Sequence, residues 1–165
     1  MSNVVTEMPH RKETDPTKTI TILSVSPFQE DHLHLQEIVS RHEWTLCPDS
    51  RCVISTTPGV ATARDILREH RLPIAVCERD LLPGTGRGLL DHISTLPDPP
   101  LLIVTSRLAD EHLWAEALDL GAYDVVAKPF DPAEVIHTLR SAWLHWKGRH
   151  DIHTPRSKQH MAAAS

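Results

Sequence analysis

The chain has 165 residues, a formal net charge of −5 and a sequence pI near 6.2. This length suits one domain with a hydrophobic core, and the acidic balance gives no electrostatic footprint for nucleic acid. No apolar stretch of the sequence approaches the roughly 20 residues that span a membrane, and the polar N-terminus carries no apolar signal-peptide core. We therefore expect a cytoplasmic protein that binds neither nucleic acid nor membrane.

Strand and helix signals alternate between two polar ends of the chain. Residues 1–18 are predicted to be a disordered leader and residues 149–165 a disordered tail, with one domain over 19–148. Strands are predicted at Thr19–Val25, Trp44–Leu46, Ile74–Cys77, Leu101–Val104 and Asp124–Ala127. The segment Cys47–Pro58 is too long for an ordinary connection, so it is either a mobile loop or contains a short strand at Cys52–Ser55.

Apolar stripes at helical spacing predict five helices between and after these strands. Their apolar residues run from Phe28 to Val39, Val60 to Leu67, Leu89 to Ile93, Leu113 to Leu118 and Val135 to Trp143. Gly121 is predicted to end the fourth helix. The run Asp131-Pro132-Ala133-Glu134 predicts a capping box with proline at the first position of the last helix.

Five strands that alternate with five helices predict a doubly wound α/β fold with a five-stranded parallel sheet. Three of the strands are followed by a polar side chain, namely Glu78, Thr105 and Lys128. The carboxyl ends of parallel strands form the edge where ligands bind in such sheets. A carboxylate, a hydroxyl and an ammonium group are therefore expected to meet there.

Three short motifs give the chain a family resemblance. They are Glu78-Arg-Asp-Leu-Leu-Pro-Gly84, Val104-Thr-Ser106 and Gly121-Ala-Tyr-Asp-Val-Val-Ala-Lys-Pro-Phe130. With these motifs, the span from Thr19 to about Lys147 resembles the receiver domain of a response regulator in two-component signalling. The resemblance implies a flavodoxin-like (βα)5 fold with strand order 2-1-3-4-5.

The resemblance also implies a set of site residues. Receivers accept a phosphoryl group on an aspartate after the third strand, with Mg²⁺ held by two acidic residues after the first strand. A Thr or Ser after the fourth strand and a Lys after the fifth contact the phosphoryl group. Thr105 and Lys128 match these two phosphoryl-contact positions, and the peptide bond from Lys128 to Pro129 is expected to be cis.

The remaining positions depart from the family pattern. Glu78 occupies the phosphoacceptor position, and Ser26 and Pro27 occupy the positions of the acidic pair. Val125 replaces the residue that switches rotamer on activation, and Leu82 replaces the usual proline after the phosphoacceptor. A glutamate is one methylene longer than an aspartate, and positioning is most of phosphoryl-transfer catalysis. We therefore expect an atypical receiver, or pseudo-receiver, that is not an enzyme.

Local chemistry gives Glu30 and Asp31 a role other than binding metal. Ser26-Pro27-Phe28-Gln29 has the pattern of a capping box, which places both acidic residues in the first turns of a helix, where the helix dipole favours them. No Mg²⁺ site and no cofactor are therefore expected. Asp80 is predicted to face solvent on the turn after the third strand.

Two other motifs have simpler explanations than a ligand site. Cys47 and Cys52 lie near His42, but this spacing matches no standard zinc pattern. Three cysteines are a sparse set that is typical of a reducing compartment. The run Gly84-x-Gly86-x-Gly88 lacks the Lys-Ser/Thr of a P-loop and predicts a tight turn.

Two hypotheses of function follow, and Glu78 is central to both. The first is a stand-alone receiver that serves bacterial signal transduction as a phosphorylation-independent interaction module. In it, Glu78 either mimics the phosphorylated state or forms a structural ion pair with Lys128. The second is a working phosphoacceptor that uses Glu78 or Asp80 with unusual Mg²⁺ ligands.

The expected partner is a signalling protein such as a histidine kinase or another regulator, with a homodimer as a further option. The expected surface is formed by the fourth helix, fifth strand and fifth helix. Trp114 and Trp146 are predicted on it because tryptophan is enriched at interface hot spots. The alternative for Trp146 is that it covers the core at the end of the helix.

Overall fold

The computed structural model describes residues 19–48, 50–81, 89–108 and 110–151. The predicted leader 1–18, the tail beyond Asp151, Leu82 and the glycine-rich turn at 84–88 lie outside the described residues. The strands are β1 (Thr19–Val25), β2 (Arg51–Thr57), β3 (Ile74–Glu78), β4 (Leu101–Ser106) and β5 (Asp124–Ala127). The α-helices are α1 (Gln29–Arg41), α2 (Glu43–Leu46), α3 (Val60–Glu69), α4 (Leu89–Thr95), α5 (Glu111–Asp119) and α6 (Pro132–Asp151).

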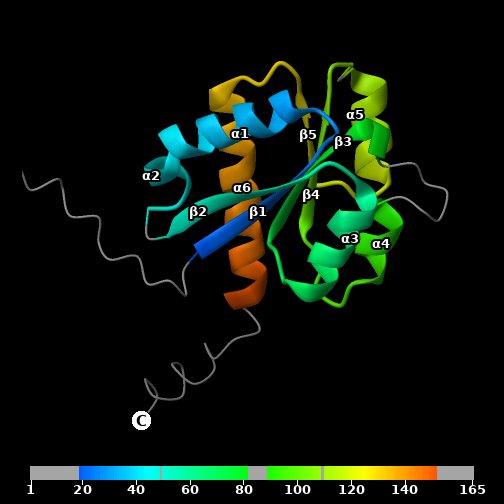
Figure 1. Cartoon of the computed structure of the whole chain (residues 1–165), viewed down its shortest axis with the longest axis horizontal. Coiled ribbons are helices and arrows are strands. Elements are labelled where there is room, and N and C mark those ends of the chain that lie inside the picture. Colours follow the sequence, from blue (N-terminus) through cyan, green and yellow to red (C-terminus); the bar gives the residue numbers. More distant parts are fainter. Residues whose placement is uncertain (1–18, 49, 82–88, 109, 152–165) are drawn as a thin grey trace, which may run out of the picture.

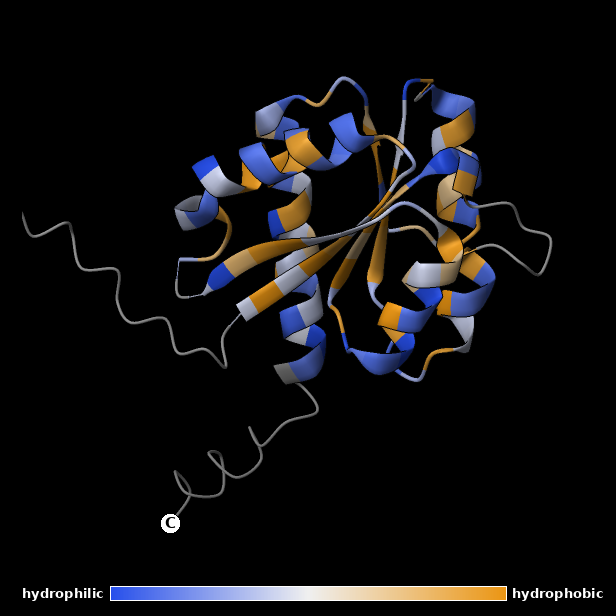
Figure 2. Ribbon diagram, viewed as in Figure 1, coloured by the Kyte–Doolittle hydropathy of each residue, from blue (hydrophilic) through white to orange (hydrophobic). Residues whose placement is uncertain are grey.

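All five strands form one parallel sheet in the order β2-β1-β3-β4-β5, which confirms the predicted fold class. Helices α1, α2 and α6 cover one face of the sheet, and α3, α4 and α5 cover the other (Figure 1). Successive residues of β3 supply the two hydrophobic cores in turn: Ile74 and Val76 pack on the α1/α6 side, and Ala75 and Cys77 on the other. The central strands β3 and β4 are accordingly apolar over most of their length, whereas the helices alternate apolar and polar residues (Figure 2).

Two helix ends follow the predicted capping chemistry. Gly121 has φ of 100° after α5; its N–H donates to the Leu118 carbonyl, and the Ala122 N–H donates to the Ala117 carbonyl. This pair of bonds is a Schellman motif, in which glycine takes the left-handed conformation. At the start of α6, the Asp131 carboxylate accepts the Glu134 N–H at 3.2 Å. Pro132 is the first residue of that helix.

The predicted second strand at Trp44–Leu46 is wrong. These residues belong to the short helix α2, and the second strand is β2. The alternative strand at Cys52–Ser55 lies inside β2. β2 is an edge strand, so its side chains are only partly covered and lack the continuous apolar run of β3. The last helix also extends to Asp151, three residues beyond the expected end of the domain at 148.

The predicted capping box at Ser26 is also wrong. α1 begins at Gln29, and its N-cap residue is Phe28, in an extended conformation without a side-chain cap. The Ser26 hydroxyl accepts the Phe28 N–H at 3.1 Å instead. Glu30 and Asp31 do lie in the first turn, as predicted. The later start of the helix leaves Ser26 and Pro27 in the loop that follows β1.

Candidate functional site

The site begins with two neighbouring side chains at the carboxyl ends of β3 and β4. Glu78 and Thr105 are partners in the sheet register and are both buried. The Thr105 hydroxyl donates a hydrogen bond to Glu78 Oε2 at 3.3 Å. Strand pairing therefore brings together two residues that lie 27 positions apart in the sequence.

Lys128 reaches the same carboxylate from the end of β5. Its backbone N–H donates to the Ser106 carbonyl at 2.9 Å, and the Lys128–Pro129 peptide bond is cis. Its Nζ lies 2.5 Å from Glu78 Oε2, and the two side chains are only 5% and 7% exposed. The expected meeting of Glu78, Thr105 and Lys128 is thus present in the structure.

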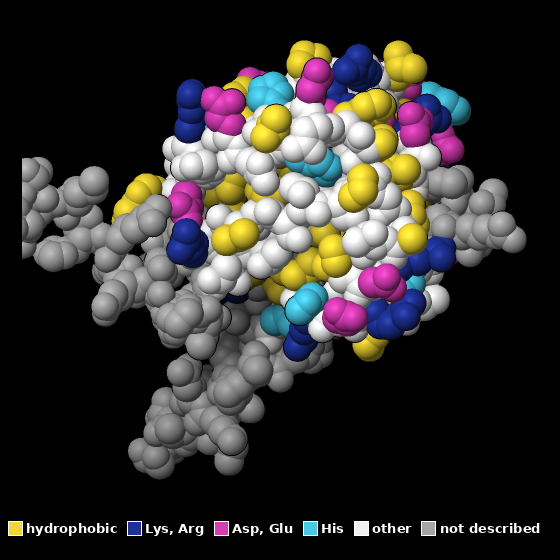
Figure 3. Space-filling view, in the orientation of Figure 1, with side chains coloured by type: hydrophobic (Ala, Val, Ile, Leu, Met, Phe, Trp, Pro, Cys, Tyr) yellow, Lys and Arg dark blue, Asp and Glu magenta, His cyan; other side chains and the backbone are white. Residues whose placement is uncertain are grey.

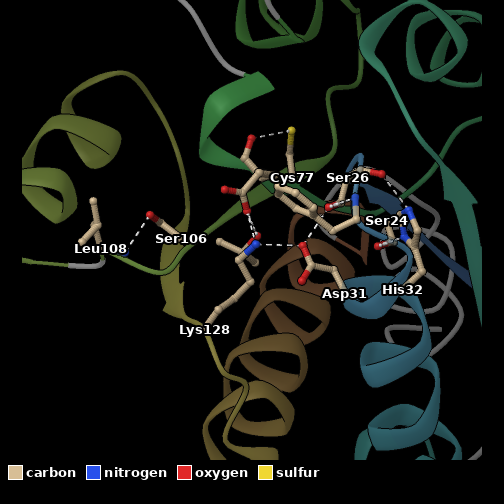
Figure 4. A network of polar contacts seen from close by, with 11 residues as sticks. Ser24, Ser26, Asp31, His32, Cys77, Ser106, Leu108 and Lys128 are labelled. Carbon is tan, nitrogen blue, oxygen red and sulfur yellow. Dashed lines mark hydrogen bonds and ion pairs between the residues drawn. The ribbon is translucent and has the colours of Figure 1, made fainter.

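A second carboxylate, which was predicted only to interact favourably with the helix dipole, completes the ion cluster. Asp31 Oδ2 lies 2.8 Å from Lys128 Nζ and accepts a hydrogen bond from the Ser26 hydroxyl at 2.7 Å (Figure 4). The Phe28 ring covers the ammonium group, with its centroid 5.0 Å from Nζ. The sequence offered no specific signal for this contact, because the helix dipole already explains an acidic residue in the first turn of α1.

The electrostatics of the cluster favour a charged lysine. Burial lowers the pKa of Lys128, but hydrogen bonds and charge attraction from Asp31 and Glu78 raise it above its ordinary value overall. One ammonium group thus serves two carboxylates. The cluster is satisfied by side chains of the chain itself.

A buried histidine fixes the loop that carries Ser26. His32 is 4% exposed; one ring nitrogen, Nδ1, lies 2.8 Å from the Ser24 hydroxyl. The other, Nε2, lies 2.9 Å from the Ser26 carbonyl (Figure 4). A carbonyl only accepts hydrogen bonds, so Nε2 carries a proton and donates it. Sequence reasoning missed this residue, because a single histidine on an apolar stripe carries no specific signal.

The donor set does not fit the Mg²⁺ ion that the resemblance implies. Ser26 and Pro27 supply no carboxylate, and Asp31 and Glu78 both bind Lys128. Among the described residues, no three His, Cys, Asp or Glu side chains gather closely enough to hold a metal ion. Asp80 is exposed in the turn Arg79–Leu81. A hard dication at this edge would need oxygen ligands that Lys128 already occupies.

The switch position and the two predicted partner residues lie away from the cluster. Val125 is 6% exposed and packs in the core on the α3/α4/α5 side. Trp114 is 49% exposed on α5, and its indole N–H donates to Asp124 at 3.4 Å. Trp146 is 7% exposed; it stacks on His150 at 3.9 Å and lies under Arg149. Its burial favours the core alternative.

Comparisons with known proteins agree with this architecture. Residues 30–140 match the response regulator receiver domain family. The regulatory protein VirG of Rhizobium rhizogenes is 30% identical over 77 residues, which are 47% of this chain and 32% of VirG. A protein-glutamate methylesterase/protein-glutamine glutaminase of Burkholderia thailandensis is 26% identical over 67% of this chain and 29% of that protein. The chain thus spans about a third of the length of these relatives.

Solved structures support the same fold. The response regulatory domain of protein mrkE from Klebsiella pneumoniae superposes with a TM-score of 0.62 at 18% identity. The match covers 78% of this chain and 99% of that one. None of the helices that the structure describes is both long enough and apolar enough to cross a membrane. With the family model covering most of the sheet and its helices, the chain belongs to the response regulator receiver domain family.

Proposed function

We propose that this receiver domain acts in two-component signal transduction as a phosphorylation-independent protein-interaction module. One observation carries the proposal: Lys128 Nζ and the Thr105 hydroxyl both bind Glu78 Oε2. These are the two side chains that the family resemblance assigns to the phosphoryl group. They hold a permanent carboxylate instead.

The geometry opposes phosphoryl transfer to Glu78 for two reasons. An attacking carboxylate oxygen must lie in line with the leaving group, and the contacts of Glu78 with Lys128 and Thr105 fix this side chain in a buried position. The transferred group also needs cations around its oxygens. Among the described residues, the cation of this cluster is Lys128, and it is shared between two carboxylates. We infer that Glu78 serves first as a structural partner of Lys128 and that the domain catalyses no reaction.

Incubation with acetyl phosphate and Mg²⁺, followed by intact-mass measurement, tests this proposal. We expect no gain of a phosphoryl group by the unaltered protein. A receiver with the complete acidic pair and aspartate serves as the positive control in the same buffer. A labile phosphoryl adduct on Glu78 or Asp80 would establish the opposite function, that of a working phosphoacceptor.

A variant that restores the family pattern sharpens the same assay. Ser26→Asp, Pro27→Asp and Glu78→Asp together would supply two metal-ligand carboxylates and the shorter acceptor at the positions where the resemblance places them. Ser26 and Glu78 already point at the Lys128 cluster. We expect this triple variant to gain a phosphoryl group that the unaltered protein does not gain.

The proposed partner surface is formed by α5, β5 and α6. Asp124 at the start of β5 joins its parts, because it accepts hydrogen bonds from Trp114 of α5 and from Thr138 of α6, both at 3.4 Å. The half-exposed Trp114 is therefore held in a fixed orientation. Figure 3 draws the molecule from the side of the edge strand β2, where hydrophobic side chains lie interspersed with charges of both signs. We propose a histidine kinase, another regulator or a second copy of this domain as the partner.

The chain offers a matched control for this surface. Trp44 on α2 is 65% exposed, and Trp114 on α5 is 49% exposed. In affinity capture and in sedimentation analysis, Trp114→Ala should weaken association by about tenfold or more, the effect of a hot-spot residue. Trp44→Ala should leave it unchanged. Equal behaviour of the two variants would remove the α5–β5–α6 surface from the proposal.

A further inference from the structure

Two of the three cysteines meet where α2 leads into the edge strand β2. Cys47 is the C-cap residue of α2, and Cys52 is the second residue of β2. Cys47 belongs to the core on the α1/α6 side, at 3% exposure, and Cys52 packs against that core as a partly buried residue. Both are free thiols.

Glu43 holds the backbones of both cysteines. Its carbonyl accepts the Cys47 N–H at 2.8 Å, and its side-chain Oε1 accepts the Cys52 N–H at 3.0 Å. One residue thus binds the end of α2 and the start of β2 at the same time. The Ser50 N–H also donates to the Cys47 carbonyl, which turns the chain back toward β2.

We propose that Cys47 and Cys52 form a reversible redox site, in which a peroxide oxidises the two thiols to an intramolecular disulfide. In the reducing compartment that the cysteine content predicts, such a bond is transient and serves as a sensor. The third cysteine, Cys77, lies in the core on the other face of the sheet, away from this pair, and takes no part.

The chemistry of the pair supports Cys47 as the attacking sulfur. A hydrogen bond with the Cys52 thiol lowers the pKa of Cys47, which burial and the charge of Glu43 only partly oppose. The same hydrogen bond, together with burial, raises the pKa of Cys52. A thiolate is the reactive form of cysteine, so the pair combines one sulfur that ionises with one that keeps its proton.

Two steps complete the oxidation. The Cys47 thiolate attacks one oxygen of hydrogen peroxide; the O–O bond breaks, and a sulfenic acid and hydroxide form. The Cys52 sulfur then attacks the Cys47 sulfur, the S–O bond breaks, and water leaves with the thiol proton. Together two thiols and one peroxide give one disulfide and two waters. A dithiol reductant reverses the reaction by exchange.

A metal site is the competing explanation, and the surroundings do not support it. His42 Nδ1 lies 2.9 Å from the Ile38 carbonyl, to which it donates as the last turn of α1 closes. Within the described part of the chain, no group of three potential ligands includes these cysteines.

The full-length reduced protein treated with hydrogen peroxide tests the proposal. We expect the intact mass to fall by two hydrogen atoms and peptide mapping to join Cys47 to Cys52. The midpoint of thermal unfolding should rise by on the order of 5 °C, because the bond closes a loop in the unfolded chain. Dithiothreitol should reverse both changes. Oxygen addition without a link, or only intermolecular links, would overturn the proposal.

Single-cysteine variants separate the two sulfurs. Cys77→Ser should oxidise as the unaltered protein does, because Cys77 lies on the other face of the sheet from the pair and its raised pKa of about 12 keeps the thiol protonated. Cys52→Ser should accumulate a sulfenic acid at Cys47, which dimedone traps, and Cys47→Ser should trap none. Trapping at Cys52 in Cys47→Ser, but not at Cys47 in Cys52→Ser, would overturn the assignment of the attacking sulfur. Circular dichroism of each reduced variant confirms that it is folded.

Discussion

Two ion clusters at opposite ends of the sheet differ in how far they are removed from water. At the carboxyl edge, the side chains of Lys128, Glu78 and Asp31 are 5%, 7% and 13% exposed. At the other end, Asp98 lies in the loop before β4 and its side chain is 25% exposed. It contacts Arg71 before β3, which is 65% exposed, and His150 near the end of α6, which is 26% exposed.

This difference in exposure separates their roles. A buried charge that loses its partner is strongly unfavourable, whereas an exposed ion pair contributes little because water and salt screen it. The Lys128 cluster is thus expected to contribute strongly to the stability of the carboxyl edge of the sheet. The Asp98 cluster links the end of α6 to the loops before β3 and β4, and we expect it to contribute little to stability.

Removing the buried lysine should give the largest effect. Lys128→Met leaves Glu78 and Asp31 buried near each other without a cation, and it should lower the free energy of unfolding by about 3–5 kcal/mol. Urea-induced unfolding followed by circular dichroism measures the loss. Arg41→Met, which breaks the exposed pair with Glu37 on α1, is the control and should change stability by less than about 1 kcal/mol. Similar losses in the two variants would contradict the difference between buried and exposed ions.

Neutralising one carboxylate should have a smaller effect on the same cluster. Glu78→Gln keeps the shape of the side chain and leaves Lys128 paired with Asp31, so we expect a loss of about 1–3 kcal/mol. Asp80→Asn, two residues further on and exposed, should be nearly neutral. Paired thermal melts measure both. Equal midpoints for the two variants would show that Glu78 is not engaged with Lys128.

The buried strands that form the framework of the site could be predicted from the sequence, because each is a continuous apolar run. Ile74–Cys77 and Leu101–Val104 are continuous apolar runs because helices cover both faces, and each is followed by a polar residue at the carboxyl edge. Glu78, Thr105 and Lys128 could therefore be placed together. The edge strand β2 lacks this coverage, and the β-prone residues Trp44–Leu46 were wrongly preferred to it.

Asp31 could not be placed by local reasoning. Its position in the first turn of α1 already has a sufficient explanation in the helix dipole. Its contact with Lys128 joins residues 97 positions apart. α1 begins at Gln29, two residues later than a Ser26 cap would allow, and Asp31 lies in its first turn. The pattern of that turn carries no information about a partner so far along the chain.

The two clusters should lose their contributions to the free energy of unfolding at opposite ends of the pH range. The pKa of Lys128 is raised overall, so its stabilisation is fully present below the ordinary lysine pKa of about 10.4 and is lost as the pH rises through the folded-state pKa. Burial raises the pKa of Asp98, but hydrogen bonds from His150 and Arg71 lower it overall. The stabilisation from the charged Asp98 carboxylate is therefore fully present above the ordinary aspartate pKa, and it is lost as the pH falls through the folded-state pKa of Asp98.

Unfolding free energies measured across the pH range test this assignment. Lys128→Met should flatten the alkaline limb of the profile and leave the acid contribution of Asp98 in place. Asp98→Asn should reduce the slope of the acid limb alone. A change of the alkaline limb in Asp98→Asn, or of neither limb in Lys128→Met, would contradict the assignment of the two clusters.

The smallest effect is expected at the exposed cluster, and salt makes it diagnostic. Arg71→Met leaves Asp98 bound to His150 at 2.8 Å and near Arg149 at 3.7 Å, so we expect a loss of about 0–1 kcal/mol. Urea-induced unfolding at low salt and in about 1 M NaCl, where charges are screened beyond roughly 3 Å, should show this loss disappear. The loss in Lys128→Met should persist, because its partners are largely removed from the ions in solution. A loss in Arg71→Met that resists salt would mean that Arg71 stabilises the loop through packing of its side chain and not through its charge.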